Sequence, residues 1–466
     1  MSIKMQPDRL TRHGFLVGFA GALGALVAAC ASSPASSPTT APSTAKAAAT
    51  AAPAAAASAG SQAKVDLVMS VRQGAEGTKP QDGIDAFQKI HPNIAVKLET
   101  FAGNEYQTKL LTLGAGGHLP DVIYTNVGFF GLFANNGFLA PLDPIIQQNK
   151  FDMTQYYKAD LDGLQWKGKL YALPWKGHAG YSAIWYDSKI LENAHLDATT
   201  VKDYDGLVAM AQKLTTDTSG AGKPNQWGWL NAGYDGWSLI GHFIAFGGDE
   251  VSPTFGATKA LLDQPKQGEA ITWLYNTLHQ WKICPLPSGE DYSKIFISGG
   301  AAMQNGGLWM SGNQAAIGSR FTQVAVPMPA GPGGSASAWH NNDQMALEAK
   351  TSHPEEGWAL LAYMGGKEMG IRLGLSQGGG SATPGARRDV YNSPELQKAV
   401  PSIKMFAAQM EVAKPQWWAA NLQTSKVWST IGQGLQKIML NAKPPSEADF
   451  HELNVLAQSV LDEPMP

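Results

Sequence analysis

The hydrophobic pattern after residue 64 alternates between two periods, which predicts an α/β fold. Residues 65–71 are a nearly continuous apolar run typical of a buried strand, and residues 80–90 repeat apolar positions at helical spacing. Residues 94–98 then alternate apolar and polar positions. The folded part of the chain therefore begins strand, helix, strand, which is typical of a parallel sheet covered by helices.

The next elements predict where a ligand would lie. Residues 106–113 have the pattern of a second helix, and residues 121–124 that of a third strand. In open α/β sheets the ligand crevice lies outside the carboxyl ends of the strands. Asn126 and Phe129 follow the third strand, so we expect them to lie near this crevice.

Residues 166–187 contain two further short strands, at residues 170–173 and 182–186, with aromatic side chains in the segment between them. Two interpretations fit. The chain crosses here from one lobe to another and presents Trp175 and Tyr181 to a ligand, or the segment is an ordinary β-hairpin whose aromatics are buried. Periodicity alone does not decide between them.

Composition narrows the class of partner. The chain has 466 residues, a net charge of −3 and 14 Trp. This length predicts two or three structural units or two lobes of one large fold, and the charge provides no basic surface for nucleic acid. Exposed Trp is costly unless it packs or binds something, and a core accounts for half or more of these residues. Cys284 lies at the end of an apolar helical run and is expected to be a buried, unpaired thiol.

Residues 1–30 have the order of a secretory signal peptide: a positive start, an apolar stretch and small residues before Cys30. The apolar stretch is too short to cross a bilayer comfortably. The small residues resemble the bacterial lipobox, which predicts lipidation of Cys30; the alternative is a plain signal peptide with a chance cysteine. Residues 31–62 are mostly Ala, Ser, Thr and Pro, which predicts a disordered tether.

Several short segments resemble the family-1 extracellular solute-binding proteins, the sugar-capturing lipoproteins of ABC importers that are related to maltose-binding protein. Each is weak alone, but their order and spacing over residues 65–370 make the set specific. Gly357 departs from the family pattern, in which Ala is usual. The segments are residues 119–123 (LPDVI), 137–143 (GFLAPLD), 168–174 (GKLYALP), 186–187 (YD), 296–303 (FISGGAAM), 326–334 (VPMPAGPGG) and 354–358 (PEEGW).

The resemblance implies a two-lobed α/β fold of the type II periplasmic-binding-protein kind. We expect a first lobe of residues 63–178 plus 327–374, a second lobe of residues 179–326 plus 375–466, and a ligand between them. The resemblance also implies that the closed form docks on a membrane permease. A monomer is expected outside the cytoplasm, held at the outer face of the membrane or in the periplasm through Cys30, with no cofactor and no nucleic acid as partner.

A sugar would need aromatic rings for its apolar faces and polar side chains for its hydroxyl groups. About half of the candidates are expected to touch the ligand. The resemblance adds an aromatic from the C-terminal tail, for which Trp417 is a candidate. The predicted ligand-binding residues are Arg72, Gln73, Glu76, Asn126, Phe129, Trp175, Tyr181, Asp235, Trp237, Trp309, Trp339, His340, Asn342 and Asp343.

Motifs of catalysis are weak in this chain. Residues 374–378 fit the G-x-S-x-G string around Ser376, but a helical pattern precedes them where a hydrolase needs a strand. His451 lacks the second histidine of a zinc helix, and no Cys or His cluster has metal-ligand spacing. We therefore expect a binding protein without catalytic or metal-binding residues.

Two alternatives remain open. A surface enzyme acting on polysaccharide would need two carboxylates at a defined separation, and Glu76, Asp235 and Asp343 do not form an evident pair. The same fold could instead bind a glycerol phosphate, a peptide or a metal complex. A phosphate would favour cationic side chains, of which Arg72 and Lys176 are the candidates; the abundance of Trp favours a sugar.

Overall fold

In the computed structural model the chain divides into two units, residues 1–60 and residues 61–466. The structure describes residues 64–74, 79–103, 105–217, 219–231, 233–288, 292–335, 337–375 and 383–464. The predicted signal peptide, Cys30 and the tether lie outside the described residues, as do Glu76 and Ser376.

A five-stranded sheet with the strand order β2-β1-β3-β10-β6 forms the first lobe. The parallel part is β1, β2 and β3, and β10 runs antiparallel to both of its neighbours. The predicted strand–helix–strand start is confirmed, with the helix α1 (Lys79–Ile90) between β1 and β2. The strands are β1 (Val65–Arg72), β2 (Ile94–Phe101), β3 (Val122–Asn126), β6 (Ala172–Gly180) and β10 (Trp339–Leu347).

A three-stranded antiparallel sheet with the order β8-β7-β9 forms the second lobe. Its strands are β7 (Ala183–Asp187), β8 (Met303–Gly306) and β9 (Gln323–Pro327), and a separate short hairpin pairs β4 (Gln165–Trp166) with β5 (Lys169–Leu170). Since β6 and β7 belong to different sheets, the chain crosses between lobes after residue 180. The predicted crossing is therefore confirmed and a hairpin of β6 with β7 is excluded, but the expectation that Trp175 and Tyr181 face a ligand is wrong, because both side chains are buried.

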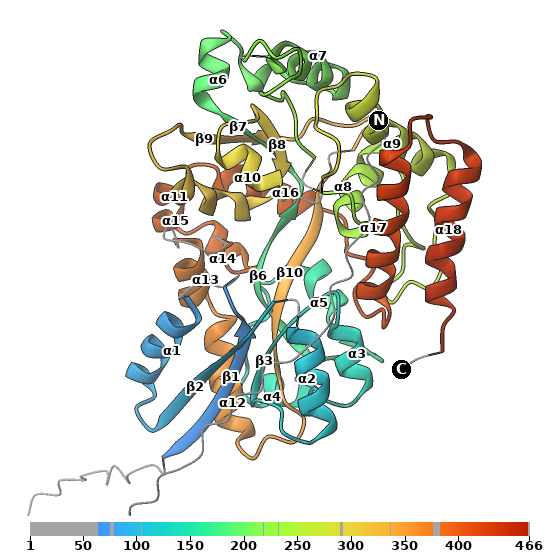
Figure 1. The fold of residues 1–466 in the computed structure, drawn as a ribbon. Coiled ribbons are helices and arrows are strands. Elements are labelled where there is room, and N and C mark those ends of the chain that lie inside the picture. The colour runs from blue at the N-terminus through green and yellow to red at the C-terminus, as the bar shows by residue number, and fades with distance from the viewer. Residues whose placement is uncertain are drawn as a thin grey trace, which may run out of the picture. The chain divides into compact units, whose positions relative to one another are not determined.

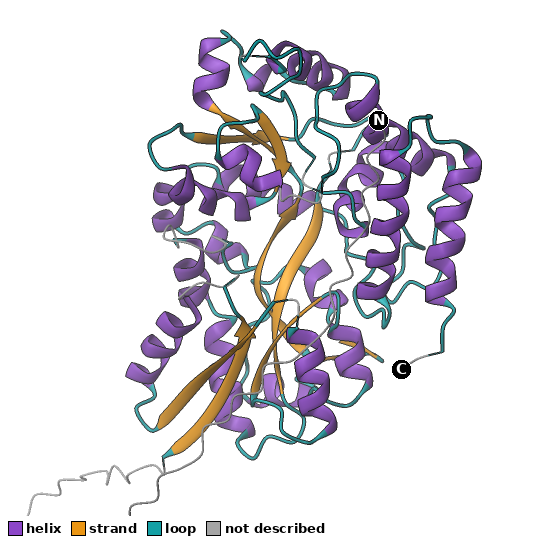
Figure 2. Ribbon diagram, viewed as in Figure 1, coloured by secondary structure: helices purple, strands orange, loops and turns teal. Residues whose placement is uncertain are grey.

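The secondary structure of the crossing also differs from the prediction. Residues 175–180 were expected to be an irregular segment between two strands, whereas they belong to the long strand β6. The pairing of β10 with β3 ends at Asp343, but its pairing with β6 continues from there to Trp339. Residues 177–180 and 339–342 therefore leave the sheet as a two-stranded ribbon that runs toward the second lobe (Figures 1 and 2). We call this pair of segments the β6–β10 ribbon.

Two hydrophobic cores accompany the two sheets, one for each lobe. In the first core, α12 packs on β1, β3 and β10. The helices that contribute to or lie beside this core are α1, α2 (Tyr106–Ala115), α3 (Phe130–Asn135), α4 (Asp143–Gln148), α5 (Lys158–Gly163), α12 (Pro354–Met364) and α13 (Lys367–Gly374).

The second core joins the middle of the chain to the C-terminal tail, and α17 packs on both α8 and α18 (Figure 1). The C-terminal tail is mostly helical. These helices are α6 (Ser188–Asn193), η1 (Ala198–Thr200), α7 (Tyr204–Leu214), α8 (Gly236–Phe246), α9 (Pro265–His279), α10 (Tyr292–Ile297), η2 (Leu308–Gly312), α11 (Asn313–Ile317), α14 (Arg388–Tyr391), α15 (Pro394–Ala399), α16 (Ile403–Val412), α17 (Thr424–Leu440) and α18 (Glu447–Leu461).

The side-chain pattern explains why individual strands and helices form where they do. The burial of β1 alternates over its first residues and then becomes continuous, as expected for a strand that enters the interior of a sheet. Helix α18 begins with a capping box, in which the Asp449 carboxylate accepts a 2.8 Å hydrogen bond from the backbone N–H of Ser446. Within the described part of the chain, no helix has the length and apolarity needed to span a membrane.

Candidate functional site

A cleft of about 390 Å³ lies where the carboxyl ends of the first-lobe strands, the β6–β10 ribbon and the second lobe meet. This is the position predicted for a ligand in an open α/β sheet. The side chains on its first-lobe side are mainly polar or charged, and those on its second-lobe side are aromatic. It is lined by Arg72, Asn126, Val127, Lys176, His178, Trp237, Trp309, Asn341, Asp343, Thr383 and Trp428.

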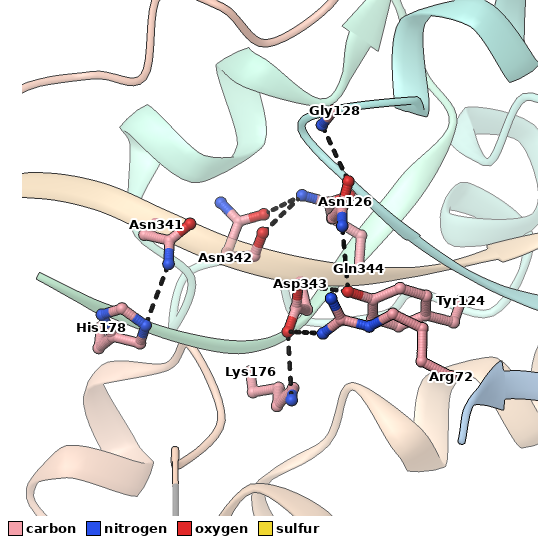
Figure 3. A network of polar contacts seen from close by, with 10 residues as sticks. All are labelled: Arg72, Tyr124, Asn126, Gly128, Lys176, His178, Asn341, Asn342, Asp343 and Gln344. Atoms are coloured by element: carbon pink, nitrogen blue, oxygen red, sulfur yellow. Dashed lines mark hydrogen bonds and ion pairs between the residues drawn. The ribbon is translucent and has the colours of Figure 1, made fainter. Parts of the chain in front are cut away.

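Asp343 is the centre of the polar wall (Figure 3). Its carboxylate lies 3.1 Å from Lys176 Nζ and 3.5 Å from Arg72 Nη2, and it accepts a 2.7 Å hydrogen bond from Tyr124 Oη. Burial alone would raise the pKa of Asp343, but the charges of Lys176 and Arg72 outweigh that effect and hold this pKa below its usual value. The carboxylate is therefore ionised and fixed in place at neutral pH.

Neighbouring groups extend this network across the strand ends. Asn126 donates to Tyr124 Oη at 3.3 Å and accepts from the backbone N–H of Gly128 at 2.9 Å. The Arg72 guanidinium lies 4.6 Å from the centre of the Tyr124 ring, a cation–π distance. The polar wall thus has donors and acceptors whose orientations are set before any ligand arrives (Figure 3).

Three partly exposed tryptophans form the aromatic wall: Trp237 at the start of α8, Trp309 in η2 and Trp428 in α17. The rings of Trp237 and Trp309 are 5.7 Å apart. Trp428 comes from the C-terminal tail, so the tail does supply an aromatic to the cleft, although the candidate from sequence was Trp417. Trp417 instead packs on Phe255, with ring centres 5.3 Å apart.

His178 and Asn341 form a cross-strand pair on the cleft face of the β6–β10 ribbon. The Asn341 amide donates to His178 Nε2 at 3.1 Å, and the imidazole lies 4.6 Å from the Trp309 ring. Burial lowers the pKa of His178 to about 4. The imidazole is therefore neutral at pH 7 and adds no charge to the cleft.

Five of the residues predicted from sequence line the cleft: Arg72, Asn126, Trp237, Trp309 and Asp343. Gln73 is exposed and does not line it. Asp235 acts as the N-cap of α8, because its carboxylate accepts a 2.7 Å hydrogen bond from the backbone N–H of Ser238.

Four predicted aromatics are buried behind the cleft surface. Phe129 and Trp175 belong to the first-lobe core, and Trp175 has no exposed surface. A bulge in the β6–β10 pairing leaves Trp175 without a partner residue in the register, so Lys176 rather than Trp175 stands opposite Asp343. Tyr181 and Trp339 belong to the second-lobe core and lie behind the tryptophan wall.

His340 and Asn342 lie on the opposite face of β10 from Asp343. Both contact the buried carboxylate of Asp160 in α5, at 3.2 Å from His340 Nδ1 and 2.6 Å from Asn342 Nδ2. This placement follows from the two-residue period of a strand, which sends successive side chains to opposite faces. Trp339, His340, Asn341 and Asn342 were expected to face the cleft together, and only Asn341 lines it.

The prediction missed His178 and Trp428, and it treated Lys176 as a candidate for a phosphate only. Lys176 and His178 could both have been found from sequence if residues 175–180 had been treated as a strand, since alternation places residues 176 and 178 on one face. Trp428 has no such signal, because its position depends on how α17 packs on α8.

Other described pockets of the molecule have fewer charged or reactive side chains than this cleft. A larger groove of about 770 Å³ runs along β9 and the start of α16, but none of the described side chains that line it is charged. Cys284 is buried and unpaired, as predicted. Among the described residues, no group of three or more His, Cys, Asp or Glu side chains could hold a metal ion.

Two lobes, a connecting ribbon and a cleft with one polar and one aromatic wall define a ligand-binding protein of the periplasmic-binding-protein fold. The family model of the bacterial extracellular solute-binding proteins matches residues 73–371. The chain therefore belongs to that family, as the sequence resemblance indicated.

Individual relatives are distant. An uncharacterised ABC transporter extracellular-binding protein of Pyrococcus horikoshii is 23% identical over 295 residues, which are 60% of this chain and only 62% of that protein. An ABC substrate-binding protein of Listeria monocytogenes, solved with cycloalternan, has a TM-score of 0.73 and 20% identity over 85% of this chain and 98% of that one. UgpB of Mycobacterium tuberculosis, solved with glycerophosphocholine, has a TM-score of 0.73 and 19% identity over 86% and 99% of the two chains. At such identities these structures confirm the fold alone.

Proposed function

We propose that this protein is the substrate-binding component of an ABC importer and captures a sugar or oligosaccharide between its two lobes. The observation that carries the proposal is the asymmetry of the cleft, with Arg72, Asn126 and Asp343 on one wall and Trp237 and Trp309 on the other. A sugar has the matching asymmetry, since its C–H faces are apolar and its hydroxyl edges form hydrogen bonds. The cycloalternan ligand of the Listeria structure is consistent with this class.

The proposal extends to cellular context. The signal-peptide pattern and Cys30 support export and attachment to the outer face of the membrane, and family membership supports delivery to a membrane permease. Ligand contact with both lobes would stabilise a closed state, since a ligand shifts a conformational equilibrium by its difference in affinity for the two states. The ligand is released unchanged in this scheme.

The first experiment is a thermal-shift screen of residues 64–466 against mono- and oligosaccharides, including maltose, maltotriose and cycloalternan. A ligand at one hundred times its dissociation constant adds about 2.7 kcal/mol to the free energy of unfolding. Saturable stabilisation with unchanged saccharide supports the proposal. Hydrolysed product would instead favour a polysaccharide-acting enzyme, and no response to any saccharide would overturn the sugar assignment.

Substitution of the aromatic wall tests the same site. Trp237→Ala and Trp309→Ala each remove a ring that would cover a sugar face, and we expect each to weaken saccharide binding by about 1–2 kcal/mol, roughly five- to thirtyfold. Trp166→Ala is the matched control, because Trp166 is a partly exposed tryptophan of β4 that does not line the cleft. Equal losses in all three variants would contradict the assignment.

A second candidate ligand is a glycerophosphodiester with a quaternary ammonium group. Arg72 and Lys176 suit a phosphate, and a set of indoles such as Trp237, Trp309 and Trp428 suits a quaternary ammonium group through cation–π contacts. UgpB, which has the same fold, was solved with such a ligand. Stabilisation by glycerophosphocholine that weakens with salt, without stabilisation by saccharides, would select this candidate.

A further inference from the structure

Tyr181 occupies an unusual backbone position at the crossing between the lobes. It lies between the end of β6 and the start of β7, with φ at +46° and only 3% of its surface exposed. A bulky residue with positive φ is rare and costs free energy. The surrounding contacts must therefore hold Tyr181 in this conformation.

The Tyr181 ring supports both indoles of the aromatic wall. It meets Trp237 at a ring distance of 4.9 Å and an interplanar angle of 65°, and Trp309 at 5.4 Å and 88°. Both are edge-to-face arrangements, which aromatic pairs favour. Tyr181 does not line the cleft itself. Its ring therefore stands behind the two indoles and restricts the orientations that they can adopt.

Polar contacts tie Tyr181 to the other crossing and to α8. Its hydroxyl lies 3.2 Å from Ser238 Oγ, one residue beyond Trp237 in α8. Its carbonyl accepts a 2.8 Å hydrogen bond from Ser337 Oγ, just before β10 begins. The next carbonyl, that of Ser182, accepts from the backbone N–H of Met328 at 2.9 Å, just after β9 ends. The two chain crossings and the indole pair thus meet at one residue.

We propose that Tyr181 is a positioning residue that sets the orientation of Trp237 and Trp309 and couples it to the backbone of the lobe crossing. A change in the angle between the lobes alters the backbone near residue 181, and the ring transmits that change to the two indoles. Conversely, a ligand that orders the indoles restrains the crossing. The inference concerns the protein without ligand, so it does not depend on the proposed sugar.

The experiment is ¹⁹F NMR of the protein labelled with 5-fluorotryptophan, without ligand. The resonances of Trp237 and Trp309 are assigned by Trp→Phe substitution, and those of Trp229 and Trp358, buried in different cores, serve as references. Tyr181→Gly removes the ring, and glycine adopts positive φ without a steric penalty. Tyr181→Phe keeps the ring and loses only the hydroxyl contact.

We expect Tyr181→Gly to move or broaden the resonances of both wall indoles and to leave both references in place, while Tyr181→Phe retains the wild-type positions. If Tyr181→Gly does not fold, Tyr181→Leu fills most of the volume without a planar ring and is judged in the same way. Unmoved wall resonances, or reference resonances that move as much, overturn the proposal. If Tyr181 only supported the fold, Tyr181→Gly would move the resonances of the reference tryptophans as much as those of Trp237 and Trp309.

The coupling to the crossing has its own variant. Ser337→Ala removes the bond to the Tyr181 carbonyl and keeps the Tyr181 ring. We expect it to move the same two resonances by a smaller amount. If Ser337→Ala leaves both resonances unchanged, the ring positions the indoles independently of the crossing and the coupling is refuted.

Discussion

At the scale of single residues, the cleft depends on charges that offset one another. Asp343 accepts from Tyr124 and is paired with Lys176 and Arg72, so two cations and one anion share a small volume. Lys176 is almost fully buried, with 4% of its side chain exposed. A buried charge that loses its partner costs more than the pair contributes. Asp343 therefore stabilises the folded chain as well as shaping the cleft.

We expect Asp343→Asn to lower the free energy of unfolding at pH 7 by about 3 kcal/mol, because it leaves the Lys176 and Arg72 charges without their carboxylate. The pKa of Asp343 is lowered in the folded state, so its contribution is complete above the unfolded-state pKa of about 3.9 and is lost as the pH falls through the lower folded value. Urea unfolding at several pH values measures both effects. Asp82→Asn, on the exposed face of α1, is the control, and a difference from wild type that stays constant down to pH 2 would contradict this account.

His178 should make stability depend on pH at less acidic values than Asp343 does. Burial lowers its pKa from 6.5 to about 4, so the unfolded chain binds a proton between these values and the folded chain does not. Stability contributed by the neutral imidazole is complete above pH 6.5 and is lost as the pH falls toward 4, by about 3 kcal/mol in total. His178→Gln should therefore reduce the decrease in the free energy of unfolding between pH 7 and pH 4.5, measured by urea unfolding at both pH values. An unchanged loss would show that the imidazole is already protonated or already exposed.

At the scale of elements, the sequence predicted the strands and helices that have strong periodicity. It did not predict the full length of β6, which begins in the first-lobe sheet and continues into the β6–β10 ribbon. The strands β1 and β2 and the helix α1 are where the pattern placed them. In β6 every residue is buried, so no apolar–polar alternation marks it, and its glycines indicate a break. The polar residues of β10 were therefore treated as candidates without the alternation that separates Asn341 from His340, and His178 of β6 was missed.

The N-terminus of α8 shows how an element places a cleft residue. Asp235 was predicted to bind ligand, but its carboxylate caps the helix that carries Trp237. We expect Asp235→Ala to lower the free energy of unfolding by about 1 kcal/mol and Asp235→Ser to restore most of it, because serine also caps helices. Thermal unfolding of the two variants measures this. If Asp235→Ser were as unstable as Asp235→Ala, capping would not be the role of this residue.

At the scale of the whole molecule, the sequence predicted the two lobes through a resemblance that covers much of the chain, whereas single residues of the cleft depended on packing. Trp428 reaches the cleft only because α17 packs on α8, nearly two hundred positions earlier in the sequence. Trp175, although adjacent to Lys176, belongs to the first-lobe core. The lobe boundaries predicted from the sequence stay a prediction, although the two cores divide the chain in a similar way.

A ligand that bridges the two walls should bring the lobes closer together. We expect the radius of gyration from small-angle X-ray scattering to decrease when a saccharide that raises the unfolding temperature is added. Trp237→Ala at the same saccharide concentration should show a smaller decrease. A ligand that stabilises the protein while the radius of gyration stays unchanged would show that binding occurs without closure.

The β6–β10 ribbon assigns different tasks to alternate residues. Along β10, Asn341 and Asp343 face the cleft, whereas His340 and Asn342 contact Asp160 on the opposite face. Substitution of Asn341 should therefore change ligand preference while His340 and Asn342 keep their contacts with Asp160. A single residue inserted in β10 would turn the cleft-facing side chains to the reverse side and the others to the cleft. The protein would then lose both the cleft contacts and the contacts with Asp160.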